Sequence, residues 1–321
     1  MSGKIQKNRF KKGNTEDKYI VVDHDREIAE RFYRVDSSWI HSKRNQRFYS
    51  NEVNALELLG ENENIVKMLN KRTVDKNGMH FLVVSLEYIK MTSLNKIILS
   101  PCYKYTAKTV GEWLRQLFSA AAFLHQKQLV HRDIKPSNIL VTDNFHLKIT
   151  DFECCKSVDP AKTNTFDVGT IRYKPPESKG FNPINGRTLF TDSGDVFSIG
   201  ITGWEIIMRS ECILEESIDD SGSMMFINDV HRTPRLRCIR EFEELITNST
   251  SISHHLRPTA LAAKSHLEEA LKNNYFNSLK FEPDFDETLT KIHLPFDVKL
   301  IKSDGNDEES RESFTPPSVD F

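Results

Sequence analysis

Four polar residues with a distinctive spacing lie in the middle of the chain, within the stretch from Leu129 to Glu153. Asp133 is followed two residues later by Lys135, then by Asn138, and after a further short segment by Asp151. An aspartate can accept a hydroxyl proton, and a neighbouring lysine can offset charge on a phosphoryl group in transit. Asparagine and aspartate supply the oxygen ligands that magnesium prefers. The set predicts phosphoryl transfer, with Asp133 and Lys135 catalytic and Asn138 and Asp151 as metal ligands.

The local sequence places these residues in loops on either side of a short hairpin. Pro136 lacks a backbone donor and disfavours helix at Lys135, so residues 131–138 are expected to form a loop. Residues 139–141 and 147–149 favour strands, and Asp143 and Asn144 between them favour a turn. The predicted order is loop, strand, turn, strand, loop.

Taken singly, a loop aspartate is usually a cap and an asparagine before a strand usually faces solvent. The joint pattern, however, resembles the catalytic loop and metal aspartate of eukaryotic protein kinases, and Lys135 resembles the serine/threonine type. The resemblance covers roughly residues 15–275 and is specific from 120 to 205. It implies an α+β, bilobal protein kinase fold, with a small β-rich lobe at about 15–86, a hinge at 87–92 and a larger, mainly helical lobe at 93–277.

The same resemblance implies ATP and Mg²⁺ as cofactors and a protein as substrate. The apolar run 81–88 is expected to be a strand that leads into a hinge, where the backbone near Glu87 would hold adenine and Leu140 would form the pocket floor. Residues 49–59 read as a helix. On it, Glu52 resembles the glutamate that grips a strand cation, and an ordinary exposed glutamate is an equally weighted alternative.

Three departures from the family fall on the nucleotide site. No glycine-rich loop precedes the expected strands 19–22 and 28–35, where only Gly13 is available. In the family, a lysine on the second of these strands pairs with the α- and β-phosphates, and that lysine is missing here. Arg31 or Arg34 can stand in for that lysine; the two lie on opposite faces of a strand, and Arg31 is favoured. Glu153 replaces the family glycine after Asp151 and Phe152, and it either weakens nucleotide binding or locks one conformation.

Further positions of the large lobe match the family. The resemblance places Thr170 against Asp133, pairs Glu177 with Arg257, and makes Asp195 the brace of the catalytic loop. Residues 110–125 and 193–208 are expected to be buried helices.

Regulation by an upstream kinase is expected at threonines in two segments. Thr163 and Thr165 lie in a stretch that resembles an activation segment, where Arg132 can pair with a phosphate. Thr315 precedes a proline in the acidic C-terminal tail. Unmodified loop threonines are an alternative of equal weight for the first two.

Composition excludes several classes of protein. The net charge of −2 gives no field for nucleic acid, no apolar run approaches the ~18 residues of a membrane span, and no signal core begins the chain. Five cysteines form no CxxC pair, which favours an intracellular protein of the cytoplasm, the nucleus or both. Residues 1–14 read as a basic arm, and 278–321 as a tail that is largely disordered after 303.

Two hypotheses for function remain open, with a nucleotide-independent binding module as a weaker third. The intact polar set favours an active serine/threonine kinase with a degenerate nucleotide-binding lobe. The losses in the small lobe favour a pseudokinase that acts as a scaffold or allosteric partner. The phrases at 85–88 and 92–95, and an acidic, irregular stretch at 209–235, resemble the TOPK/PBK-like subgroup.

Overall fold

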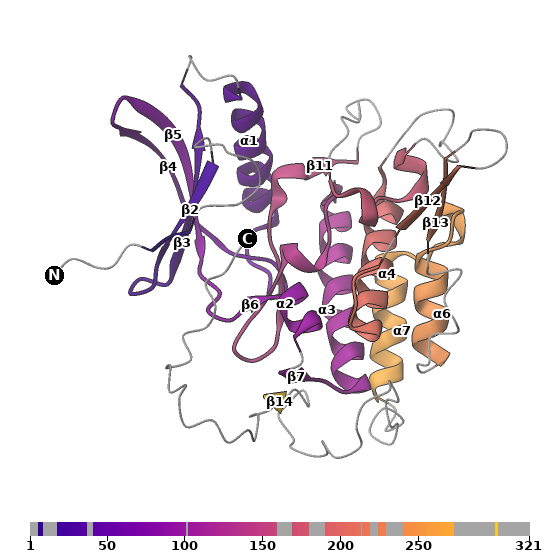
Figure 1. The fold of residues 1–321 in the computed structure, drawn as a ribbon. Coiled ribbons are helices and arrows are strands. Elements are labelled where there is room, and N and C mark those ends of the chain that lie inside the picture. Colours follow the sequence, from indigo (N-terminus) through magenta and orange to yellow (C-terminus); the bar gives the residue numbers. More distant parts are fainter. Residues whose placement is uncertain are drawn as a thin grey trace.

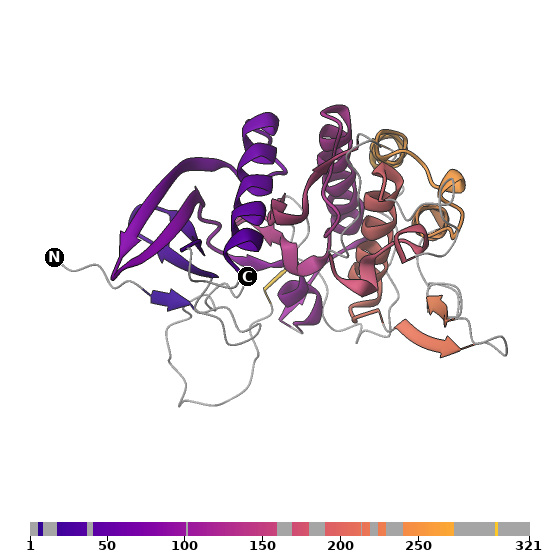
Figure 2. The same cartoon turned by 90° about the horizontal axis from the view of Figure 1, so that it is seen from above.

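The computed structural model describes residues 6–8, 18–36, 41–100, 102–158, 169–179, 190–212, 214–218, 224–228, 240–272 and 299–300. They form a small lobe built on one sheet and a larger lobe built mainly on helices, side by side in Figure 1. Seen from above, helix α1 stands between the sheet and the helical lobe (Figure 2).

The small lobe is a twisted antiparallel sheet with one helix against it. Its strands are β1 (Gln6–Asn8), β2 (Lys18–Asp23), β3 (Ile28–Arg34), β4 (Met68–Lys76) and β5 (Met79–Glu87), in the order β1-β2-β3-β5-β4. Side chains of β3 alternate between the faces, so Ala29, Arg31 and Tyr33 share one side of the sheet. The strand β4 escaped the sequence reading because most of its residues are exposed and polar.

Helix α1 (Ser42–Leu59) begins well before the expected Tyr49. The hydroxyl of Ser42 donates to the Val35 carbonyl at 2.8 Å, and the Asn45 amide donates to the Arg34 carbonyl at 2.9 Å. These bonds tie the first turn of α1 to the end of β3. The first two turns are mostly polar, so they carry no apolar periodicity by which the sequence could place the start.

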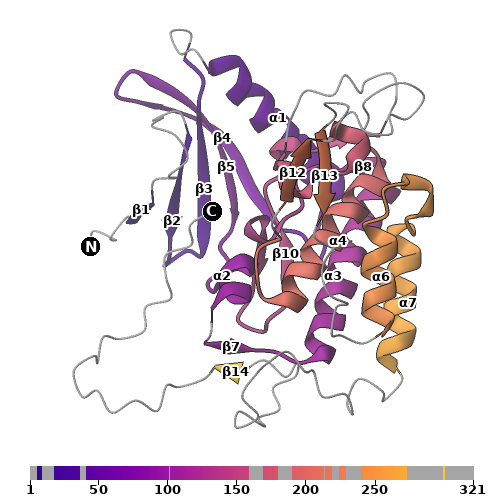
Figure 3. The ribbon, with the colours of Figure 1, turned by 45° about the vertical axis from the view of Figure 1, so that its right-hand side comes forward.

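The large lobe is organised around helix α3 (Ala107–Gln126), whose apolar face packs against α4 and α7. The other described helices are α2 (Leu94–Leu99), α4 (Asp192–Met208), α6 (Arg240–Ser249) and α7 (Ala260–Lys272). Helices α3 and α4 match the expected segments 110–125 and 193–208. Figure 3 shows α6 and α7 beside α3 and α4 on the side away from the sheet.

Short strands connect and border these helices. The strands β6 (Thr92–Ser93), β9 (Ile139–Val141) and β10 (Leu147–Ile149) form one sheet. The remaining short strands form two-stranded sheets, which are β8 (Leu129–Val130) with β11 (Lys156–Ser157), β7 (Tyr103–Lys104) with β14 (Lys299–Leu300), and β12 (Leu214–Ile218) with β13 (Met224–Asn228). The β9–β10 hairpin follows the expected order of strand, turn and strand. The acidic stretch at 209–235, expected to be irregular, contains the β12–β13 hairpin.

Two contacts join the lobes near the hinge. Ile65 bridges to Ile149 of β10, whose carbonyl accepts from the Val66 amide at 2.9 Å. The Glu87 carboxylate accepts from the Lys67 amide at 2.8 Å and from the Lys148 ammonium at 2.7 Å. The end of β5 is thereby fixed to the large lobe. Within the described ranges, no helix has the length and apolar character that crossing a membrane requires.

Candidate active site

The loop that carries Asp133 is held from below by a buried aspartate on α4. Asp195 accepts from the backbone amides of His131 at 2.9 Å and Arg132 at 3.0 Å, one to each carboxylate oxygen. Arg132 has a left-handed backbone with φ of 68°, a conformation that costs energy for a side chain larger than glycine. The two amide bonds stabilise that turn and present Asp133 to the cleft.

The carboxylate of Asp133 accepts four hydrogen bonds. One oxygen accepts from the Thr170 amide at 2.8 Å and the Thr170 hydroxyl at 2.9 Å. The other accepts from the Lys135 ammonium at 2.7 Å and the Asn138 amide at 2.9 Å. Each carboxylate oxygen of Asp133 is therefore held by two neighbouring donors.

Thr170 reaches Asp133 because Gly169 precedes it. Gly169 has φ of 89°, and a β-carbon built there would lie 2.5 Å from the Arg132 carbonyl oxygen. No larger residue fits without moving one of the two segments. The chain from 169 to 179 therefore approaches the catalytic loop closely at this point.

Asp151 also has a left-handed backbone, with φ of 70° and ψ of 64°, and its side chain is 28% exposed. Burial alone raises the pKa of this carboxyl, but Arg31, Lys18 and Lys135 outweigh burial and lower its pKa to about 2. It is therefore charged at neutral pH, and an ionised carboxylate is a favourable ligand for magnesium.

The oxygen donors of Asn138 and Asp151 suit magnesium. The Asn138 side-chain nitrogen is used by the carbonyl and carboxylate of Asp133, which leaves the amide oxygen as its acceptor. Among the described residues, no group of three or more His, Cys, Asp or Glu side chains can hold a metal by itself. A hard cation here therefore needs further oxygens, such as those of phosphate groups.

Arg31 is the arginine that meets helix α1. Its guanidinium lies 2.5 Å from the Glu52 carboxylate, 3.1 Å from that of Asp151 and 3.3 Å from the Thr150 hydroxyl. The side chains of Arg31 and Glu52 are 3% and 0% exposed, so Glu52 is not an exposed helix residue. Arg34 instead contacts Asp36 at 2.5 Å. Burial raises the pKa of Glu52, and Arg31 opposes this only in part.

Two residues that the sequence analysis did not assign to the site complete this network. The Lys18 ammonium contacts Glu153, whose carboxylate also accepts from the Tyr33 hydroxyl at 2.8 Å. The same Tyr33 hydroxyl lies 2.6 Å from Glu52. A lysine at the start of a strand and a tyrosine two residues after an arginine give no signal in the sequence, because only β2–β3 pairing brings them together.

Glu153 does not sit in a glycine-like conformation. Residues Phe152–Cys154 form a turn of 3-10 helix, and Glu153 has negative φ. The Glu153 carbonyl accepts from the Asn51 side chain of α1 at 2.8 Å, and Phe152 is fully buried. These contacts fix the position of the segment, and both expectations for Glu153 remain predictions.

Leu140, the residue expected to form the floor of the adenine pocket, packs against the hinge. Leu140 on β9 packs in one cluster with Ile89 and Tyr88. The Glu87 side chain is bound by Lys67 and Lys148, and its backbone amide donates to the Lys67 carbonyl at 2.9 Å, so neither group is available to a base. The Tyr88 amide donates to the Glu27 carbonyl at 2.9 Å, which ties the β2–β3 turn to the hinge.

The expected ion pair of the large lobe is present. Arg257 meets Glu177 through two parallel hydrogen bonds of 2.7 and 2.8 Å, and both side chains are 0% exposed. The predicted phosphosites Thr163, Thr165 and Thr315 lie outside the described residues.

The family comparison matches residues 23–276 to the protein kinase domain. Since that match spans well over half of the chain, the protein belongs to the protein kinase domain family. The match begins after Lys18 and after the segment where the glycine-rich loop is expected, whereas Arg31 and Glu153 lie within it.

Curated relatives are kinases matched over part of their length. The chain is 27% identical over 196 residues to cyclin-dependent kinase 20 of Danio rerio, covering 60% of this chain and 54% of that protein. It is 33% identical over 190 residues to the serine/threonine-protein kinase drp72 of Corynebacterium efficiens, covering 57% and 34%. It is 29% identical over 203 residues to CTD kinase subunit alpha of Schizosaccharomyces pombe, covering 60% of this chain and 32% of that protein. The chain thus spans about half or less of these relatives.

A solved structure shares the fold. The CAK complex from Chaetomium thermophilum bound to ATP-gamma-S contains a chain that matches with a TM-score of 0.63 at 21% identity, over 81% of this chain and 89% of that chain. The α+β, bilobal protein kinase fold expected from the sequence is confirmed.

Proposed function

We propose that the protein is a serine/threonine protein kinase that transfers the γ-phosphoryl group of ATP to hydroxyl groups of a protein substrate. The observation that carries the proposal is the Asp133 carboxylate, braced by Lys135, Asn138 and Thr170 beside the charged Asp151. In this arrangement Asp133 accepts the proton of the substrate hydroxyl, and Lys135 offsets charge on the phosphoryl group. Such a set has no evident use in a protein that only binds.

The proposed cofactors are ATP and Mg²⁺. Asn138 and Asp151 would hold the metal, which supplies charge neutralisation at the phosphates. Leu140 and the backbone at Glu87 would hold adenine, and Arg31 with Glu52 would fix α1 against the site. The ATP analogue bound in the CAK complex structure supports the choice of nucleotide by analogy alone.

A pseudokinase is the second candidate, and one observation favours it. Arg31 contacts the carboxylates of Glu52 and Asp151, and Lys18 contacts that of Glu153, so the cations of the small lobe already have partners. A nucleotide must compete with these carboxylates. A scaffold that keeps the fold without turnover would have the same contacts.

Binding and transfer measured together separate the two candidates. Calorimetric titration with ATP, with and without Mg²⁺, is followed by transfer of labelled phosphate to a generic basic protein. The kinase proposal expects binding that needs Mg²⁺ together with transfer. Binding without transfer supports the pseudokinase, and absence of binding excludes both nucleotide functions. Asp151→Asn should weaken Mg²⁺-ATP binding, and unchanged affinity would remove Asp151 as a metal ligand.

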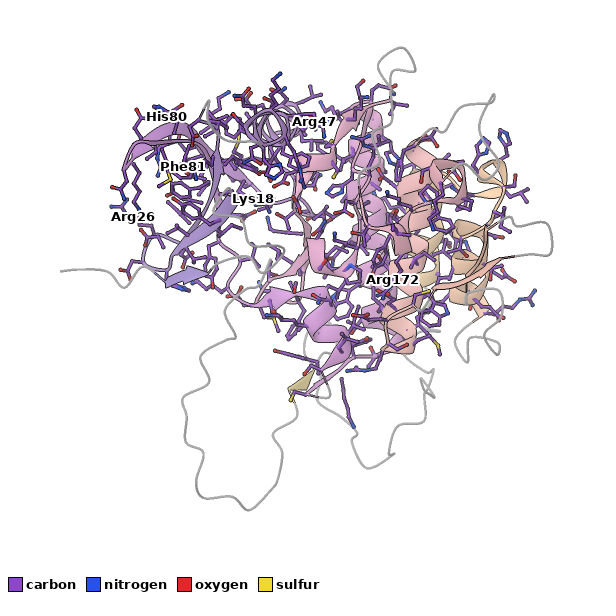
Figure 4. The ribbon with its side chains drawn as sticks, turned by 45° about the horizontal axis from the view of Figure 1, so that its top comes forward. Lys18, Arg26, Arg47, His80, Phe81 and Arg172 are labelled. Atoms are coloured by element: carbon purple, nitrogen blue, oxygen red, sulfur yellow. The ribbon has the colours of Figure 1, made fainter. Side chains whose placement is uncertain are left out.

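Control by an upstream kinase at Thr163 or Thr165 belongs to the same proposal. Arg132, Arg47 on α1 and Lys156 on β11 lie close enough to repel one another electrostatically, and Figure 4 labels Arg47. Burial, followed by repulsion from the two arginines, lowers the pKa of Lys156. A phosphate on the adjacent segment would relieve that repulsion. Thr315 has no such support among the described residues.

We also propose that the protein belongs to the TOPK/PBK-like subgroup and that it is intracellular, in the cytoplasm, the nucleus or both. Its kinase domain is proposed to span residues 15–277, between a basic arm and an acidic tail. Limited proteolysis followed by mass spectrometry would test the domain bounds. Cleavage concentrated within 15–277 would contradict them.

A further inference from the structure

Lys18 and Arg31 of the small lobe both contact carboxylates of the proposed site, and the two cations differ in their access to solvent. The Arg31 side chain is 3% exposed and contacts Glu52, Asp151 and Thr150. The Lys18 side chain is 26% exposed, and its ammonium contacts Glu153. Figure 4 places Lys18 on the side of the small lobe that faces the large lobe. Of the two, Lys18 is the one that a ligand in the cleft can reach.

Strand pairing fixes where Lys18 lies relative to the hinge. The β2–β3 turn is tied to the hinge by the bond between Glu27 and Tyr88, and Val22 pairs with Ala29 near that end. Lys18 pairs with Tyr33 at the other end of the same two strands. Lys18 lies four residues from Val22, so the two share a face and stand about 13 Å apart along the strand. A nucleotide with its base at the hinge directs its phosphates toward Lys18.

The carboxylates around Lys18 fit a phosphate-binding role. Attraction to Glu153 and Asp151 outweighs burial and raises the pKa of Lys18 above its ordinary value, so the ammonium stays charged. An ammonium has three N–H donors, so it can donate to Glu153 and to a phosphate oxygen at the same time. The Tyr33 hydroxyl fixes Glu153 at 2.8 Å, which in turn orients Lys18.

We infer that Lys18 on β2 is the cation that contacts the nucleotide phosphates, while Arg31 on β3 is held by the carboxylates of Glu52 and Asp151 and does not contact the phosphates. In the family, one strand lysine contacts both the phosphates and the helix glutamate; here the two contacts are divided between Lys18 on β2 and Arg31 on β3. Glu153, which departs from the family pattern, is the residue that aims Lys18. This inference rests on the proposed function for its ligand, a nucleoside triphosphate, and it does not require that transfer occurs.

The test compares two ligands that differ only in phosphates. Calorimetric titration measures adenosine and Mg²⁺-ATP against the full chain, Lys18→Met and Lys71→Met. Lys71 on β4 is the matched control, because it also pairs with a glutamate (Glu57) but is exposed on the small lobe. Lys18→Met should weaken Mg²⁺-ATP about 10-fold, as loss of one charge-assisted contact does, and should leave adenosine within about twofold. Lys71→Met should change neither.

The outcomes are distinct for the inference and for the proposed function. Unchanged ATP affinity in Lys18→Met, or equal loss of adenosine and ATP, overturns the role of Lys18. A wild-type protein that binds ATP no tighter than adenosine overturns it as well. A Lys18 effect on ATP in a protein without phosphate transfer keeps the inference and removes the kinase proposal. Intact transfer with normal ATP affinity in Lys18→Met does the reverse.

A folding defect is recognised by thermal unfolding without nucleotide. If Lys18→Met has no cooperative transition, Lys18→Arg keeps the positive charge and replaces it in the titration. Lys18→Arg should retain a preference for ATP over adenosine. Loss of that preference in a folded Lys18→Arg, or failure of both variants to fold, assigns Lys18 a structural role and overturns the inference.

Discussion

The large-lobe and small-lobe sides of the proposed site both form connected networks of hydrogen bonds and ion pairs, although only the large-lobe side keeps the sequence pattern of the family. On the large-lobe side, Asp133, Lys135 and Asn138 keep the family spacing, and Lys135 and Asn138 both donate to the Asp133 carboxylate. On the small-lobe side, neither the glycine loop nor the strand lysine is present, yet Arg31 and Lys18 form a buried network with three carboxylates. Loss of a sequence motif therefore does not imply loss of an organised site.

The difference lies in how charge is balanced. The Asp133 carboxylate is surrounded by donors from its own loop and from Thr170. Glu52, Asp151 and Glu153 share two cations, and the Tyr33 hydroxyl lies within hydrogen-bond distance of both glutamates. The small-lobe network thus carries an excess of carboxylates, which a bound cation or a proton can relieve.

The largest expected effect separates chemistry from binding. Asp133→Asn should lower phosphate transfer by about 10²–10⁴-fold, because the amide cannot accept the hydroxyl proton. Affinity for Mg²⁺-ATP should stay within about twofold, since Asp133 faces the substrate. Transfer assays and calorimetry on the same preparation check both values. Normal turnover would show that Asp133 is not the base and would dissolve the distinction between the two sides.

The buried ion pairs of the two lobes should differ in stability when the arginine is removed. Arg257→Met leaves Glu177 buried without its bidentate partner and should cost about 3–5 kcal/mol in the free energy of unfolding. Arg31→Met should cost less, about 1–3 kcal/mol, because Glu52 already has a raised pKa, can take up a proton and keeps Tyr33. Denaturant unfolding measures both. A larger cost for Arg31→Met would contradict this account of charge balance.

Glu153→Gln tests whether the excess negative charge weakens nucleotide binding. A unit charge about 8 Å from a phosphate is worth roughly 2 kcal/mol at an effective dielectric near 20, before salt screening. Loss of the Lys18 contact offsets part of the gain, so Mg²⁺-ATP affinity should rise about threefold. Calorimetry at several magnesium concentrations checks the change. The same substitution in Lys18→Met should give a larger gain, because no Lys18 contact is left to lose, and weaker binding in Glu153→Gln would indicate that aiming Lys18 outweighs the repulsion.

The smallest effect concerns pH and the large-lobe loop. His131 donates to the Thr150 carbonyl and accepts from the Asp133 amide, and burial lowers its pKa below 6.5 despite Asp195, Asp133 and Asp151. Well above pH 6.5, the His131 imidazole is neutral in both the folded and the unfolded chain. As pH falls below that value, the unfolded chain binds a proton that the folded chain does not, so stability decreases. Denaturant unfolding at pH 7.5 and 5.5 should show a smaller decrease in His131→Gln; identical decreases would contradict a buried neutral His131.

The sequence alone was sufficient to predict the local structure of much of the large lobe. The catalytic loop, the β9–β10 hairpin and the helices α3 and α4 were predicted because their signals are local: residue spacing, turn residues and apolar periodicity. The expected contacts of Thr170, and the pair of Glu177 with Arg257, followed from resemblance rather than from spacing. The polar start of α1 and the exposed strand β4 were missed because they carry no such pattern.

Only the tertiary structure decided how the small lobe replaces its missing lysine. The alternation of β3 left Arg31 and Arg34 on opposite faces, and only the packing of α1 brings Glu52 to Arg31 at 2.5 Å. Lys18 and Glu153 are 135 positions apart in the chain, and their contact depends on the β2–β3 register and on the 3-10 turn after Asp151. Long-range pairing of charges leaves no periodic trace in a sequence, because it is fixed by the packing of elements rather than by neighbouring residues.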